Sequence, residues 1–134
     1  MSCAGAILSP SDPEPIVIAV VDDELLVRMI AEEVLTDEGY HVLEAGDADE
    51  ALRILEARPD TRVLFTDVTM PGSLNGYALA EIARRRWPRL LVIVASGDAG
   101  PGASALPAGA RYLQKPYAPS ELLRLVQDML IAAA

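Results

Sequence analysis

From residue 16 onward, short apolar runs alternate along the chain with segments of helical periodicity. Apolar runs predict strands at Ile16–Val21, Val63–Asp67 and Leu90–Ala95, while a half-polar strand is expected at His41–Ala45 and a short fifth strand at Arg111–Gln114. The segments between and after them predict helices at Leu25–Glu38, from the cap Asp47 to Ala57, from the cap Asn75 to Arg86, and at Pro119–Ile131. A chain that alternates in this way favours a single α/β domain whose parallel sheet is covered on both faces.

The degree of apolarity indicates the order of the strands. The first, third and fourth runs are the most apolar and should be central, so right-handed crossovers favour a doubly wound, flavodoxin-like sheet of order 2-1-3-4-5. Glycines and prolines crowd the interval between Ser96 and Arg111, so we expect a short or irregular fourth helix there. The first expected helix presents one apolar face, made of Leu26, Met29, Ile30 and Val34. Arg84-Arg85-Arg86 reads as a solvated helix end.

Length and charge narrow the class of protein. The 134 residues suit one domain, and we expect a mobile tail over residues 1–15 and the folded domain over residues 16–134. The net charge of −9 argues against non-specific binding to nucleic acid or to an anionic membrane. No apolar run reaches the roughly 18 residues that span a bilayer. No signal peptide is recognisable, and Cys3 is the single cysteine. We therefore expect a cytoplasmic protein.

Carboxylates follow two of the central strands, at the edge where parallel sheets bind ligands. Asp22 and Asp23 come directly after the first strand, and Asp67 ends the third. Neighbouring strands would bring the three side chains into one pocket. Two carboxylates about 4 Å apart repel by about 4 kcal/mol at an effective dielectric near 20, so the cluster must raise its pKa values, recruit a cation, or both. Oxygen ligands of this kind suit Mg²⁺, with Mn²⁺ as an alternative.

Three further residues complete the expected pocket. Ser96 offers a hydroxyl after the fourth strand, and Gly97 lets its backbone N–H approach a ligand closely. Lys115 adds an ammonium at the end of the fifth strand. A carboxylate nucleophile, a hard cation, a hydroxyl and an ammonium together form a phosphoryl-transfer site. In this site Asp67 attacks, Mg²⁺ and Lys115 neutralise the transferring oxygens, and Ser96 holds the product.

With these motifs in place, the chain resembles the CheY-like receiver domain of response regulators in two-component signalling. The resemblance rests on Asp22-Asp23, on Asp67 in Asp-x-x-Met-Pro-Gly, on Ser96-Gly97 and on Lys115-Pro116, in this order. It covers residues 16–132. We expect a stand-alone receiver domain, with no effector domain after the last expected helix.

The resemblance also implies which residues bind the metal and the phosphoryl group. Asp67 would be the phospho-acceptor. Asp23 and Asp67 would ligate Mg²⁺ directly with the backbone carbonyl of Thr69, while Asp22 would act mostly through water. The backbone N–H group of Val68 would contact the phosphoryl group.

Further contacts and the switch follow from the same resemblance. Lys115 and the backbone N–H group of Gly97 would contact the phosphoryl group, and the bond from Lys115 to Pro116 would be cis. Ser96 would be the switch hydroxyl, and Tyr112 would be the aromatic side chain whose position reports the switch.

A receiver domain of this kind would take its phosphoryl group from a histidine kinase or a histidine phosphotransfer protein and would act on an unidentified downstream protein. Its only enzymatic activity would be self-catalysed phosphoryl acceptance and autodephosphorylation. Two alternatives stay open. One is a pseudo-receiver that binds its partner without phosphate. The other is a Mg²⁺-dependent aspartyl phosphatase. Such enzymes resemble Asp-x-Asp-x-Thr at the nucleophile, and here Thr69 stands in place of the second aspartate, which would be the acid/base.

Overall fold

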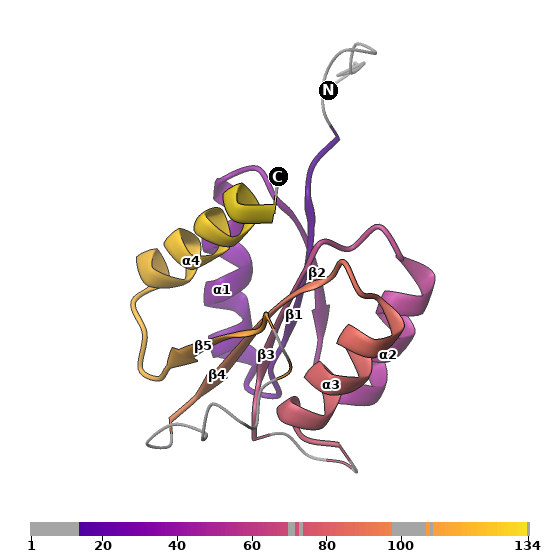
Figure 1. Ribbon diagram of the computed structural model, residues 1–134. Coiled ribbons are helices and arrows are strands. Elements are labelled where there is room, and N and C mark those ends of the chain that lie inside the picture. Colours follow the sequence, from indigo (N-terminus) through magenta and orange to yellow (C-terminus); the bar gives the residue numbers. More distant parts are fainter. Residues whose placement is uncertain (1–13, 70–71, 73, 98–106, 108, 134) are drawn as a thin grey trace.

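The computed structural model describes residues 14–69, 72, 74–97, 107 and 109–133 (Figure 1). The strands are β1 (Val17–Val21), β2 (His41–Ala45), β3 (Val63–Asp67), β4 (Leu91–Ser96) and β5 (Arg111–Gln114). The helices in this part of the chain are α1 (Leu25–Asp37), α2 (Ala48–Ala57), α3 (Gly76–Arg86) and α4 (Pro119–Ala133). All strand pairs are parallel and run in the order β2-β1-β3-β4-β5, which confirms the predicted fold.

The sheet separates two helical layers. Helices α1 and α4 cover one face, and α2 and α3 cover the other (Figure 1). Successive residues of β1 alternate between the layers, so that Ala19 and Val21 pack toward α2 and α3 while Ile18 and Val20 pack toward α1 and α4. Every residue of β1 and β3 is buried, which is why both strands read as apolar runs without alternation.

The two predicted helix caps are present. The Asp47 side chain accepts a hydrogen bond of 2.8 Å from the backbone N–H of Glu50, and the Glu50 side chain accepts one of 2.8 Å from that of Gly46. The Asn75 side chain accepts a bond of 2.9 Å from the backbone N–H of Ala78. Turn and cap residues therefore fixed where α2 and α3 begin.

Helix α1 packs on the sheet through a different face from the one that its sequence suggested. The buried side chains are Ala31 and Leu35. Leu26, Met29 and Ile30 are 73%, 49% and 55% exposed, so most of the apolar face that the sequence indicated is turned toward solvent. Of the predicted face, only Val34 packs against the core.

The reason is that α1 carries apolar side chains around most of its circumference. Periodicity alone cannot then choose which face turns inward. Polar contacts of Arg28 on the same helix hold its first turns against the end of the sheet: a guanidinium nitrogen donates to the carbonyl of Asp22 at 2.9 Å, and Nε donates to Glu44 at 3.0 Å. These contacts form only in the folded protein, so the sequence of the helix alone does not show which face they turn inward.

Some expectations fall outside the described part of the chain. Residues 1–13, where the tail was expected, are among those not described, as are residues 98–106 and 108, which contain most of the expected irregular helix. None of the helices that are described combines the length and the apolar composition needed to cross a bilayer.

The packing of α1 gives a direct test of its orientation. Leu35 is fully buried and Leu26 is 73% exposed, on the same helix. Leu35→Ala should lower the free energy of unfolding by about 2–5 kcal/mol, because it leaves a cavity. Leu26→Ala should change it by about 0.5 kcal/mol or less. Urea denaturation of both variants measures the difference, and equal losses would show that α1 is rotated from the position described.

Candidate phosphoryl-acceptor site

Three carboxylates meet at the carboxyl edge of the sheet. One side-chain oxygen from each of Asp22, Asp23 and Asp67 lies within 4.8 Å of the others. The register explains the meeting, because β1 pairs with β3 so that Val21 lies level with Thr66. Asp22 and Asp67 are 5% and 7% exposed, whereas Asp23 is exposed. The cluster therefore combines two buried acids with one that faces solvent.

Each oxygen of Asp22 has its own partner. Oδ1 accepts a hydrogen bond of 2.9 Å from the backbone N–H of Glu24, so Asp22 does stabilise the turn before α1. Oδ2 lies 3.4 Å from the ammonium of Lys115. Asp22 therefore stabilises the turn before α1 and belongs to the acidic cluster at the same time.

Lys115 reaches the cluster from the segment after β5. Its ammonium lies 3.0 Å from Oδ1 of Asp67, and its side chain is 21% exposed. The backbone N–H of Lys115 donates to the carbonyl of Ser96 at 2.8 Å, which ties the lysine to the end of β4. The bond from Lys115 to Pro116 is cis, as the resemblance implied.

Burial and charge act against each other on the central pair. Burial raises the pKa of Asp67, and although the hydrogen bond and charge of Lys115 oppose it, the pKa stays above its usual value. Burial lowers the pKa of Lys115, but the hydrogen bond to Asp67 and the charges of Asp22 and Asp67 outweigh it, so the pKa is raised. One ammonium thus faces more negative charge than it neutralises.

The donor set suits a hard divalent cation. Carboxylate oxygens are the ligands that Mg²⁺ prefers, and Asp22, Asp23 and Asp67 offer them within one small volume that has an exposed side at Asp23. Thr69 lies exposed two residues past Asp67, and the role of its carbonyl as a ligand stays a prediction.

The two backbone donors expected for a phosphoryl group differ in their surroundings. The N–H of Val68 already donates to the carbonyl of Ala95 at 3.0 Å, and it also lowers the pKa of Asp67 as a hydrogen-bond donor. It faces the acceptor residue, and its contact with a phosphoryl group stays a prediction. Gly97 is exposed at the mouth of the site, with the Lys115 side chain as its nearest neighbour.

The two expected switch residues contact each other through one main-chain atom. Ser96 is 3% exposed at the end of β4. The Tyr112 hydroxyl, which is half-buried, donates to the Ser96 carbonyl at 3.1 Å. The same carbonyl accepts the backbone bond from Lys115. A movement of the Ser96 main chain would therefore change the hydrogen bonds of both Tyr112 and Lys115.

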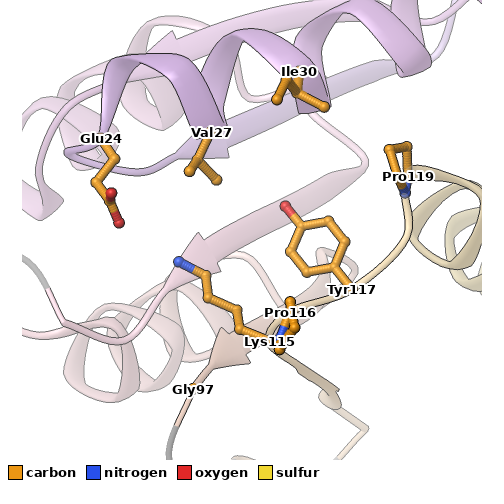
Figure 2. Close-up of a pocket in the computed structure, with 8 residues that line it drawn as sticks. All are labelled: Glu24, Val27, Ile30, Gly97, Lys115, Pro116, Tyr117 and Pro119. Atoms are coloured by element: carbon orange, nitrogen blue, oxygen red, sulfur yellow. The ribbon is translucent and has the colours of Figure 1, made fainter.

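A groove of about 490 Å³ opens beside the site, between α1 and the segment after β5 (Figure 2). Its lining residues are Glu24, Val27, Ile30, Gly97, Lys115, Pro116, Tyr117 and Pro119. The ring of Tyr117 packs edge-on against Phe65, with centroids 5.7 Å apart. Burial, reinforced by Asp22 and Asp67, raises the pKa of the Tyr117 hydroxyl to about 12, although Lys115 opposes this. The groove is thus mainly apolar with the ammonium of Lys115 at one end.

The sequence reasoning missed two residues that position the site. Arg28 donates to the carbonyl of Asp22 and bridges to Glu44 on β2, so it holds the acidic turn in place. A single basic residue in the first turns of the expected helix, six positions after Asp22, was the only signal, and it does not identify its partners. Gly76 is the second, and its backbone N–H donates to the carbonyl of Val68 at 2.9 Å.

Gly76 is a glycine because the chain passes too close for a side chain. A Cβ at this position would overlap the main-chain carbonyl of Asp67. The first turn of α3 is therefore packed directly against the backbone that carries the acceptor residue. A glycine straight after the cap Asn75, where most residues would suit a helix better, was the signal in the sequence.

The comparisons with known proteins agree with this geometry. Residues 18–127 match the model of the response regulator receiver domain, and the chain belongs to this family. Its members are receiver domains of two-component response regulators, which act as phospho-accepting switches.

Several relatives and solved structures are similar over most of the chain. The probable transcriptional regulator ycf27 of Cyanophora paradoxa is 36% identical over 115 residues, which cover 84% of this chain and 47% of that protein. The transcriptional regulatory protein PdtaR of Mycobacterium tuberculosis is 35% identical over 113 residues, which cover 82% and 54%. The chain thus spans about half the length of these curated relatives.

Among solved structures, a response regulator receiver protein from Sinorhizobium medicae superposes with a TM-score of 0.84 at 26% identity and covers 90% of this chain and 98% of that one. The receiver domain of the hybrid histidine kinase CckA gives a TM-score of 0.74 at 35% identity, with 85% and 98% covered.

The close approach at Gly76 predicts an unusual penalty. Alanine would normally stabilise a helix relative to glycine by about 1 kcal/mol. Gly76→Ala should instead lower the free energy of unfolding by about 1–3 kcal/mol, because the backbone of Asp67 must shift. Urea denaturation measures the loss. Gly46→Ala is the control, since its Cβ would meet only side-chain atoms at 3.5 Å and beyond. Equal stability of the two variants would contradict the described contact.

Proposed function

We propose that this chain accepts a phosphoryl group on Asp67 and thereby switches the binding of a partner. The observation that carries the proposal is the ammonium of Lys115, 3.0 Å from a buried acceptor carboxylate that shares its pocket with two more acids. This is the arrangement that phosphoryl transfer requires, namely a positioned nucleophile and charges that can neutralise the transferring oxygens.

Each residue has a defined task in the reaction. An oxygen of Asp67 forms a bond to phosphorus while the phosphorus–nitrogen bond of a donor phosphohistidine breaks, and the imidazole nitrogen leaves with the electron pair. Lys115 stabilises the negative charge on the transferring oxygens, and the backbone N–H of Gly97 donates to them. Mg²⁺, or Mn²⁺ in its place, would be held by Asp22, Asp23 and Asp67 with the Thr69 carbonyl, and would supply positive charge to the same oxygens.

The switch acts through the end of β4. A phosphoryl group on Asp67 attracts the Ser96 hydroxyl as a hydrogen-bond donor, which moves the main-chain carbonyl that Tyr112 and Lys115 share. The phosphorylated state then favours one of two arrangements of Tyr112, and a partner that binds this arrangement shifts the population further.

A protein donor has an obvious surface on which to dock. Four large apolar side chains on the first turns of α1, which we call the α1 patch, are 49–73% exposed: Leu25, Leu26, Met29 and Ile30. Ile30 also lines the groove beside Lys115, so the α1 patch adjoins the site (Figure 2). Contiguous exposed apolar surface marks protein interaction sites. We infer that a histidine kinase or a histidine phosphotransfer protein covers this patch while its phosphohistidine reaches Asp67.

Replacement of the acceptor residue tests the chemistry. Wild-type protein incubated with acetyl phosphate and Mg²⁺ should gain the mass of one phosphoryl group, and Asp67→Asn should gain none, because an amide oxygen is a poor nucleophile. Intact-protein mass spectrometry provides the measurement. Asp60→Asn, at an exposed aspartate in the loop that leads into β3, at the edge of the sheet opposite Asp67, should be labelled like the wild type.

Other outcomes of this assay would support the rival functions. Labelling of Asp67→Asn would exclude Asp67 as the acceptor. A wild-type protein that takes no phosphoryl group would point to the pseudo-receiver. Sustained turnover of a phosphomonoester would point to the aspartyl phosphatase.

The role of the α1 patch separates a protein donor from a small one. Leu26→Ser should slow transfer from the most active autophosphorylated histidine kinase of the same cell by about ten- to a hundredfold, because a leucine side chain buried in an interface contributes about 1.5–3 kcal/mol. Labelling by acetyl phosphate should not change. Ile131→Ser is the control, since Ile131 on α4 is also 73% exposed but lies away from the site. Equal slowing by both variants would contradict docking on the α1 patch.

A further inference from the structure

A second pocket lies at the opposite edge of the sheet from Asp67. It has a volume of about 850 Å³ and is formed by the loops that lead into β3 and β4. Arg62 precedes β3 and Arg89 precedes β4, whereas Asp67 and Ser96 end these two strands. Because the strands are parallel, their first residues share the edge of the sheet opposite the phosphoryl-acceptor site. The pocket is therefore separate from the proposed phosphoryl chemistry.

Basic residues are concentrated around this pocket, although the molecule as a whole is acidic. The chain as a whole carries a net charge of −9. Six of its 11 basic residues nevertheless lie in the two loops and in the last turn of α3: Arg58, Arg62, Arg84, Arg85, Arg86 and Arg89. The pocket itself is lined by three of these arginines against a single aspartate, Asp60.

Four of the six arginines have partners that explain them within the fold. Arg58 pairs with Asp60 at 2.9 Å and Arg86 with Glu56 at 2.8 Å. Arg85 lies 3.8 Å from Glu81, one turn earlier on α3. Arg84 donates to the carbonyls of Pro88 and Leu90 at 2.8 and 2.6 Å and so holds the loop between α3 and β4.

Arg62 and Arg89 have no such explanation. Both are exposed and both line the pocket. Within the residues that the structure describes, neither has a carboxylate within 4.0 Å. Two guanidinium groups that share one concave site repel each other, and the repulsion contributes nothing to folding. An anionic ligand would turn this arrangement into a favourable one.

Part of the lining of the pocket is apolar. Trp87 lines it, and the guanidinium carbon of Arg86 stacks 4.5 Å from the centre of the Trp87 ring. Pro59, Pro88 and Leu90 add further apolar surface. Arginine and tryptophan beside each other are typical of the residues that dominate the energy of protein interfaces.

We propose that this pocket binds an acidic peptide segment of a partner protein. Carboxylates of the segment pair with Arg62 and Arg89, and an apolar side chain between them lies on Trp87 and the two prolines. The volume exceeds what a phosphate or sulfate ion fills, and one side of Trp87 is taken by Arg86, which leaves less room for a stacked base than for a peptide. The acidic surface of the rest of the chain would repel such a segment and so restrict it to this pocket.

The test uses Trp87, the only tryptophan in the chain, as its reporter. A short synthetic peptide that alternates glutamate with leucine is titrated into the full-length protein while the fluorescence of Trp87 is followed. We expect saturable binding that weakens as the salt concentration rises. The double variant Arg62→Gln/Arg89→Gln should bind about tenfold more weakly, because two ion pairs at exposed arginines are lost.

A matched variant separates specific pairing from net charge. Arg53→Gln/Arg124→Gln removes the same charge from two exposed arginines on α2 and α4 that do not line the pocket, and it should bind like the wild type. Unchanged labelling by acetyl phosphate would show that both double variants are folded. Equal weakening in the two, absence of saturable binding by the wild type, or displacement of the peptide by an equal concentration of inorganic phosphate or ATP would overturn the proposal.

Discussion

The crowding of three carboxylates around one ammonium is the constraint on which the rest of the structure depends. The register between β1 and β3 leaves Asp22 and Asp67 no way to separate, and both are nearly inaccessible to water. Two carboxylates about 4 Å apart cost about 4 kcal/mol at an effective dielectric near 20. Lys115 offsets part of this cost, yet the pKa of Asp67 remains raised. The core must therefore be stiff enough to hold charges that repel one another, and the two fully buried central strands provide that stiffness.

Much of this arrangement could be predicted from the sequence, because it depends on local signals. Continuous apolar runs indicated the three central strands, and Asp47 and Asn75 indicated the starts of two helices. The polar ends of the strands then identified the edge at which the site lies. The inference from strand ends to a shared pocket needed only the parallel topology, which the alternation of elements already implied.

What could not be predicted depends on contacts between distant segments. The rotation of α1 is one example, because apolar residues on several faces give the same helical signal whichever face is buried. The passage of α3 across the carbonyl of Asp67 is another, since a glycine after Asn75 signals that some segment passes close by but does not identify Asp67 as that segment. The bridge from Arg28 to Asp22 and Glu44 likewise joins three elements that only the folded sheet brings together.

The position of the α1 patch follows from the same constraint. The turn that holds Asp22 and Asp23 leads directly into α1, so the orientation that places the acids also decides which side chains of the helix face water. A cluster of exposed apolar side chains gives no benefit to a free monomer, because water is ordered around it without any gain in packing. The exposed Ile131 on α4 shows that isolated apolar residues are tolerated elsewhere on this molecule, whereas the four on adjoining turns of α1 form the patch on which we propose that a donor docks. The acidic residues at this edge would repel the phosphoryl group of a donor protein. Apolar contact with the α1 patch would instead hold a proposed donor next to the acceptor, without any need for electrostatic attraction.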